Sequence, residues 1–305
     1  MAGAFTHMVI VAEAIKSFPV DKKFGKILRE NKSFLTLGSV SPDIPYLAHL
    51  AMQGFAWADI MHYYNTNRIV NNALHSLKAA KTKGKVWNKQ LTWLLGFVSH
   101  LVADATIHPI VENIVGPYTD KKNISNHREC EMIQDVLLFK EIINLELSAS
   151  EYTDFLRASF QDPSFDQVAY FWAIHAEANC PFTGGFPTEQ IISSYIKELD
   201  TAEGGNALAR AFRHFGIDYF YRTHKDITQN SSELVKKYYS NIELPNGQIG
   251  TFRINGFDYA VHNLVAIWSK IERSLFSTDN IFSIVPNWNL DTGIDQETQT
   301  RTYWS

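Results

Sequence analysis

The chain has 305 residues, of which 45% are hydrophobic, 13% aromatic and 20% charged. This composition excludes a disordered chain, because enough apolar side chains are present to offset the entropy lost on folding. The 28 basic and 32 acidic residues leave a net charge of −4, so no global positive field attracts a nucleic-acid backbone. We therefore predict a folded protein without a stable nucleic-acid partner.

Cysteine use and apolar segments indicate the cellular compartment. Cys130 and Cys180 are far apart and form no CxxC motif, which argues against a disulfide framework and a thiolate zinc knuckle. The longest apolar stretch, Leu91–Val102, is interrupted by His100, so no membrane span is predicted. The first residues lack a basic region and include Glu13, which argues against a secretory signal. We predict a cytoplasmic protein, with secretion by a signal-less route as the alternative.

Most of the chain is predicted to be helical. Apolar residues recur at helical spacing in these segments: 8–18, 57–77, 87–115, 127–145, 150–160, 164–178, 188–200, 205–230 and 255–275. Thr6 is the expected N-cap of the first helix. Gly38, Pro42 and Pro45 are expected to break any regular element after it and to expose Asp43 on a constrained loop.

The later segments complete the predicted architecture. The strongly apolar segment 87–115 reads as a central core helix, which Pro109 either kinks or divides. Asn246-Gly247 between alternating apolar residues predicts one small β-hairpin near 242–254. The last twenty residues are polar and show no clear periodicity. The predicted fold class is an all-α, multi-helix bundle with this one hairpin.

The central helix carries the clearest chemical pattern. His100, Asp104 and His108 follow each other at i, i+4 and i+8, so they span only about 80° of one helix face. Imidazole and carboxylate groups at this spacing can share a divalent cation. His127, Glu131 and Asp135 repeat the same spacing on the next helix. This repetition favours a metal site over a single hydrogen-bonded His–Asp pair in the core.

Chance alone produces some of these pairs. A histidine followed four residues later by an acid is expected about once (11 × 32/305 ≈ 1.2), and His100, His108, His127 and His214 each have such an acid. His100 and Asp104 lie in the most apolar segment, where an unpaired polar group is costly. His214 and Asp218 lie in an aromatic-rich helix without a second cluster, and a hydrogen-bonded core pair is the favoured interpretation there.

The same residues carry a family resemblance. The ordered series THMVIVAEAI, GSVSPDIPYL, MHYYN, GFVSHLVADATIHP and HRECE resembles the bacterial zinc-dependent phospholipase C superfamily. That group includes the N-terminal catalytic domain of glycosylphosphatidylinositol-specific phospholipase D. The resemblance covers residues 1–145, a metal-binding core, and residues 146–305 are expected to be a mainly helical continuation packed on it.

The resemblance implies two to three zinc ions held in an all-helical domain. It places Asp43, His62, His100 and Asp104 at the first ion and His108, His127 and Glu131 at the second. His7 and Asp104 would hold the third ion together with the α-amino group of Ala2, and Asp104 would bridge two ions. The resemblance also gives Asp43 a catalytic role, orienting or deprotonating the attacking water.

The implied activity is a zinc-dependent hydrolysis of phosphate esters. The substrate would be a phospholipid or a small phosphate ester, with transient contact to a membrane surface. Ile44 and Phe5 stand where a choline-binding site needs other side chains, so choline recognition is not predicted. Aromatic residues able to line a lipid or base-stacking pocket, or else to fill the core, are Phe55, Trp57, Tyr63, Tyr64 and Trp93. The alternatives are a single-strand nuclease or nucleotide phosphatase of the same fold, and a biosynthetic enzyme or effector that uses the metals differently.

Overall fold

The computed structural model describes residues 3–47, 53–147, 152–179, 185–193, 223–230, 232–276 and 284–304. Its α-helices are α1 (Ala4–Ala14), α2 (Lys23–Glu30), α3 (Lys32–Val40), α4 (Ile44–Leu47), α5 (Gln53–Tyr63), α6 (Thr66–Ala79), α7 (Lys85–Val115), α8 (Ile124–Ile143), α9 (Tyr152–Phe160), α10 (Phe165–Glu177), α13 (His224–Asn230), α14 (Ser232–Val235) and α15 (Tyr259–Phe276). Single 3-10 turns occur at Ile15–Ser17 and Lys121–Asn123, and π-helical turns at Lys236–Ser240 and Phe252–Asp258. The predicted all-α class is confirmed.

Two small antiparallel sheets accompany the helices in the described part of the chain. Strands β1 (Ile242–Glu243) and β2 (Ile249–Gly250) form the expected hairpin near 242–254. Strands β3 (Trp288–Asn289), β4 (Ile294–Asp295) and β5 (Thr300–Arg301) form a second sheet in the order β3-β4-β5. Two-residue strands are too short to show a period of two, which is why the sequence pattern did not reveal this sheet.

Several predicted boundaries are wrong. Helix α1 begins at Ala4, so Thr6 lies inside it instead of capping it. The predicted helix 57–77 is divided at Asn65, whose φ of 50° is the left-handed conformation that asparagine tolerates. Pro109 does not start a new helix, because α7 continues through it. The expected helical pattern at 205–230 lies outside the described residues up to 222.

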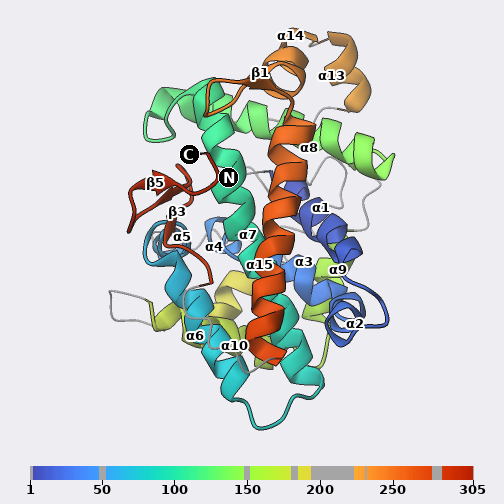
Figure 1. Cartoon of the computed structure of the whole chain (residues 1–305), viewed down its shortest axis with the longest axis vertical. Coiled ribbons are helices and arrows are strands. Elements are labelled where there is room, and N and C mark those ends of the chain that lie inside the picture. The colour runs from blue at the N-terminus through green and yellow to red at the C-terminus, as the bar shows by residue number, and fades with distance from the viewer. Residues whose placement is uncertain are drawn as a thin grey trace.

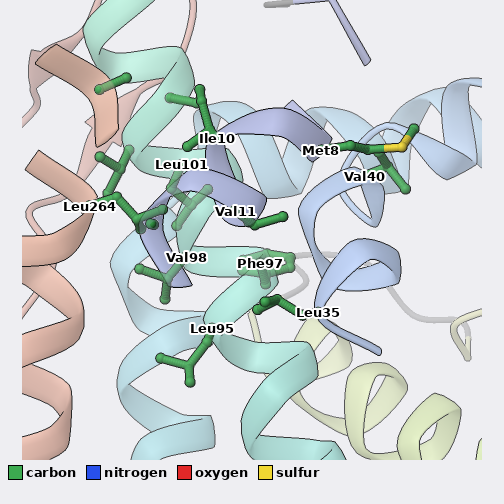
Figure 2. Close-up of a cluster of buried hydrophobic side chains, with 14 of the residues drawn as sticks. Met8, Ile10, Val11, Leu35, Val40, Leu95, Phe97, Val98, Leu101 and Leu264 are labelled. Carbon is green, nitrogen blue, oxygen red and sulfur yellow. The ribbon is translucent and has the colours of Figure 1, made fainter. Parts of the chain in front are cut away.

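Helix α7 is the centre of the molecule, with α1, α3 and α15 packed around it (Figure 1). Buried side chains from these four helices interdigitate, as the cluster in Figure 2 shows: Met8, Ile10, Val11, Leu35, Val40, Leu95, Phe97, Val98, Leu101 and Leu264. Helix α7 is long and apolar enough to cross a membrane, but its whole apolar window is buried inside the protein. It is therefore a core helix, as its sequence predicted.

Helix α3 packs on α7 through a contact between two glycines. A Cβ atom on Gly38 would lie 2.0 Å from the Trp93 carbonyl oxygen, and one on Gly96 would lie 2.2 Å from the Leu35 carbonyl oxygen. Only hydrogen fits at both positions, so the two backbones touch. The break predicted at Gly38 does not occur, because this glycine serves helix packing inside α3.

The C-terminal sheet is fixed to the helices beside the same part of α7. The Trp304 indole donates to the Thr106 carbonyl oxygen at 2.7 Å, and Arg301 pairs with Glu112 at 3.1 Å. Gly293 has a φ of +65°, and a Cβ atom there would lie 2.5 Å from the Ala105 carbonyl oxygen. The turn between β3 and β4 therefore lies directly against α7.

Candidate metal centre

Six predicted site residues meet in the interior next to the middle of α7. His7 comes from α1, Asp43 from the turn after α3, His62 from the end of α5, and His100, Asp104 and His108 from α7. All six side chains are buried, with at most 5% of the surface of each residue exposed. Elements distant in sequence thus converge on the face that the i, i+4, i+8 spacing indicated.

The first group consists of Asp43, His62 and His100. The Asp43 Oδ1 atom lies 3.2 Å from the Nε2 atom of His62 and 3.6 Å from that of His100. Each histidine donates its Nδ1 hydrogen to a backbone carbonyl, His62 to Ala58 at 2.8 Å and His100 to Ser39 at 2.9 Å. This assignment of the hydrogen to Nδ1 leaves the Nε2 lone pairs directed at the group, where one metal ion can be held.

The second group consists of His7, His100 and Asp104. The Asp104 carboxylate lies 3.3 Å from His7 Nε2 and 3.2 Å from His100 Nε2. The rings of His7 and His100 stack with centroids 4.0 Å apart. Neither ring nitrogen of His7 has a hydrogen-bond partner among the described residues, although both are buried. Ligand atoms from all three residues lie within 4.8 Å of one another.

His108 extends the cluster along α7. Its Nε2 atom lies 3.3 Å from Asp104 Oδ1, so Asp104 lies within 3.3 Å of His7, His100 and His108, and it is also 4.0 Å from His62. Asp104 therefore stands at the junction of the cluster, which is the position of a residue that could bridge two ions.

His127 and Glu131, from α8, are placed differently. The Nε2 hydrogen of His127 is donated to the Gly116 carbonyl oxygen at 2.7 Å, which leaves Nδ1 as the free lone pair. Both residues are buried, and burial lowers the pKa of His127, although the charge of Glu131 partly opposes this effect. Within the described residues, neither belongs to a group of three ligand atoms close enough for one ion.

Asp135, the third member of the α8 pattern, has a structural role. Its carboxylate accepts hydrogen bonds from the backbone N–H of Thr6 at 2.8 Å, the hydroxyl of Thr6 at 2.6 Å and the backbone N–H of Phe5 at 3.3 Å. It thereby satisfies the first free donors of α1. Asp135 thus fixes the start of the helix that carries His7.

Asp291 is a neighbour of the cluster that the sequence did not indicate. Its Oδ1 atom lies 3.8 Å from His108 Nδ1, and its Oδ2 atom accepts the Tyr63 hydroxyl hydrogen at 3.0 Å. It lies in the polar C-terminal stretch, without a histidine at helical spacing and far from α7 in sequence. No local pattern could have revealed it.

The other candidates are scattered or outside the described residues. Trp57 and Trp93 are buried core residues, while Tyr64 is 57% exposed. Phe5 is fully buried and lies against Phe139, and Ile44 is also fully buried. The side chain of Phe55, the terminal residue Ala2 and the His214/Asp218 pair all lie outside the described residues.

The electrostatics of the cluster keep Asp43 and Asp104 ionised and His108 neutral. Burial raises the pKa of Asp43, but His100 and His62 outweigh this effect and bring the pKa below its ordinary value. Burial also raises the pKa of Asp104. The neighbouring His108, His100 and His7 outweigh this effect and bring the pKa of Asp104 well below its ordinary value. Burial holds the pKa of His108 well below its ordinary value. Ionised carboxylates and neutral imidazoles are the forms that bind metal.

The donor set fits zinc of the hydrolytic kind. It offers imidazole nitrogens and carboxylate oxygens without any thiolate, which is the composition of catalytic zinc sites. Buried ring nitrogens of His7 and His108 lack hydrogen-bond partners in the described part of the chain, and a metal ion would satisfy them. The chemistry of these residues therefore agrees with a zinc centre.

Comparison with known protein families points to the same chemistry. A family model described as zinc-dependent phospholipase C matches residues 6–177, more than half of the chain. No curated protein and no solved structure matches the chain. The matched segment contains all six clustered residues and also His127 and Glu131.

Proposed function

The chain belongs to the zinc-dependent phospholipase C family, and on that premise we propose that its buried cluster binds two to three zinc ions and hydrolyses phosphodiesters. One observation carries the proposal: the buried Asp104 carboxylate lies within 3.3 Å of three buried histidines. An arrangement of this kind without a metal would leave several buried polar atoms unsatisfied.

The proposed ligand assignment follows the groups. Asp43, His62, His100 and Asp104 would hold the first ion, and the four carboxylate–imidazole distances in this set, between 3.2 and 4.0 Å, support it. His7 and Asp104 would hold another, with Ala2 as the expected terminal ligand. The remaining ion would take His108, His127 through its Nδ1 atom, and Glu131. Residues 1–145 would then be the metal-binding core, with 146–305 packed on it.

Bound zinc would supply Lewis acidity, which lowers the pKa of a coordinated water and stabilises charge on the phosphoryl oxygens. Asp43 is proposed to orient the attacking water and accept its proton, and its lowered pKa keeps the carboxylate ionised and able to accept a hydrogen bond from that water. The Ala58 and Ser39 carbonyls fix the rings of His62 and His100. The surrounding core excludes bulk water from the site, which strengthens electrostatic interactions there.

The substrate class follows from the family and is a phospholipid, with a small phosphate ester as the alternative. Choline recognition is not proposed, because Ile44 and Phe5 are both fully buried and can contribute no polar or aromatic contact to a headgroup. Contact with a lipid surface would be transient.

Metal analysis and an activity screen test the proposal. Protein purified without chelators should contain two to three equivalents of zinc and cleave phospholipid vesicles, and single-stranded DNA and nucleotides provide the competing substrates. Asp104→Asn should lower the hydrolysis rate by about 100-fold or more, since it removes a bridging charge worth several kcal/mol to the transition state. Asp162→Asn, which breaks a pair with Lys89 on the far end of α7, is the matched control. Less than half an equivalent of metal would contradict the proposal.

A further inference from the structure

We infer that Asp291 is a positioning residue for the metal-binding ring of His108, supplied by the C-terminal sheet from outside the family-matched segment. The inference rests on the proposed function, because it takes His108 as a zinc ligand. It concerns the side of His108 that faces away from Asp104. A histidine binds metal well only when its second ring nitrogen is held by another group, which fixes the ring and its tautomer.

The other histidines of the site show how such rings are held. His62, His100 and His127 each direct one ring nitrogen at a backbone carbonyl oxygen, at distances of 2.7–2.9 Å. The other nitrogen of each ring is thereby left for a ligand. In the described part of the chain, no carbonyl oxygen bonds the Nδ1 atom of His108, and the group facing it is the Asp291 carboxylate at 3.8 Å.

The orientation of His108 selects its metal-binding nitrogen. The Nε2 atom is buried, has no hydrogen-bond partner among the described residues, and lies 3.3 Å from the junction residue Asp104. With Nε2 directed at the ion, the hydrogen must be on Nδ1, where it points to Asp291. A movement of about 1 Å brings this ion-pair contact to hydrogen-bond length.

Asp291 is itself held in place on its other side. The Tyr63 hydroxyl donates to its Oδ2 atom at 3.0 Å, and its backbone N–H donates to the side chain of Asn289 at 3.1 Å. The next contacts tie this turn to α5, because Leu290 N–H donates to the His62 carbonyl at 3.0 Å and the Gln296 side chain donates to the Tyr63 carbonyl at 2.7 Å. The carboxylate is therefore fixed relative to α5, the helix that carries His62.

With that contact shortened, Tyr63, Asp291 and His108 would form a relay that ends at the proposed metal site. A carboxylate at the distal nitrogen makes the imidazole a more basic ligand than a carbonyl does, and loss of such partners typically weakens metal binding about 10–100-fold. We therefore expect Asp291 to set the affinity for the ion at His108 without contacting the ion itself.

Metal affinity measures this role directly. Zinc titration against a chromophoric chelator should show that Asp291→Ala weakens the binding of one ion by about 10–100-fold and leaves the affinity for the others unchanged. Asp291→Asn keeps a hydrogen-bond acceptor and should lose less zinc affinity than Asp291→Ala. Tyr63→Phe should lose the least zinc affinity of the three. Cobalt(II) substituted at the same site should give an altered visible spectrum in Asp291→Ala.

Asp295→Ala is the matched control from the same sheet. Its carboxylate accepts only local hydrogen bonds in the described structure, from Glu297 N–H at 3.0 Å and the Thr298 hydroxyl at 3.1 Å. It should destabilise the segment without changing metal affinity. Equal loss of affinity in Asp295→Ala and Asp291→Ala would assign Asp291 a merely structural role, and unchanged affinity in all three relay variants would overturn the inference. Since the readout is binding, a protein that binds zinc but hydrolyses no phosphodiester would contradict the proposed function alone.

Discussion

Helix α3 and the turn between β3 and β4 both contact α7 through a glycine that lies against the helix backbone. Each of these segments places a polar group beside a different histidine of α7. At Gly38 and Gly96, helix α3 touches α7, and the Ser39 carbonyl reaches His100. At Gly293, the turn between β3 and β4 touches α7 at Ala105, and Asp291 faces His108. The first contact joins two helices inside the main core, whereas the second attaches a short sheet at the edge of the helical body.

The two contacts are expected to differ in how much they contribute to the stability of the fold and how much to the site alone. The α3–α7 contact positions the ring of His100, a proposed metal ligand, and also packs the core, so it cannot be altered without cost to the whole fold. The Gly293 contact places Asp291 beside His108 from a separate sheet, whose Trp288 and Leu290 side chains reach the core from its edge. We expect changes at the first contact to unfold the protein and changes at the second to affect mainly the ion at His108.

The largest effect is expected from Gly96→Ala. The new methyl group would lie 2.2 Å from the Leu35 carbonyl oxygen and force α3 away from α7. Overpacking of this kind costs about 3 kcal/mol in the free energy of unfolding, and it should also weaken metal binding at His100. Chemical denaturation monitored by circular dichroism measures the loss.

Gly84→Ala provides the control for that experiment. A Cβ atom on Gly84 would have nothing within 4 Å. The free energy of unfolding should therefore change by less than about 0.5 kcal/mol. If Gly96→Ala were as stable as Gly84→Ala, the two helix backbones would not be in contact.

A smaller and more local effect is expected from Gly293→Ala. The positive φ costs an alanine about 1–2 kcal/mol, and its methyl group would meet the Ala105 carbonyl oxygen at 2.5 Å. The turn should lift from α7, weakening zinc binding at one ion while the helical core keeps its stability. Hydrogen exchange of the C-terminal sheet, compared with that of α7, checks this separation. Exchange that increases equally in both would show that the sheet and core unfold together.

The smallest effect concerns the ion pair that fastens the sheet. Arg301→Met removes the contact with Glu112, in which the two side chains are 32% and 19% exposed. Such a pair contributes about 0.5–1 kcal/mol at low salt. The difference from the wild type should shrink in 1 M NaCl, because salt screens the pair. Lys16→Met, which removes a more exposed pair with Glu13, should leave the exchange of the sheet unchanged.

Much of the fold was predictable because long helices carry a strong signal. Helix α7 was expected from its apolar run, and the hairpin from Asn246-Gly247. The second sheet was not, since its strands have two residues each and are held by contacts with α5 and α7. The role of Gly38 was also hidden, because a glycine that ends a helix and one that permits close packing look the same in sequence.

Site residues that lie close together in the sequence were predictable from spacing, and those from distant segments were not. His100, Asp104 and His108 share one helix face, so spacing alone indicated that they converge. Asp43 and His62 joined them only through the family resemblance. The spacing that suggested a ligand role for the acids after His127 was misleading for Asp135, which caps α1.

The hydrogen bond between Tyr63 and Asp291 joins residues 228 positions apart. The site can therefore be completed only late in the synthesis of the chain. At ~5–20 residues per second, the ribosome would deliver Asp291 about 10–45 s after Tyr63. The segments that carry the six clustered residues would be complete by then. An ion held by His108 in this interval would lack the contribution of Asp291, and it would be retained more firmly once the final sheet docks.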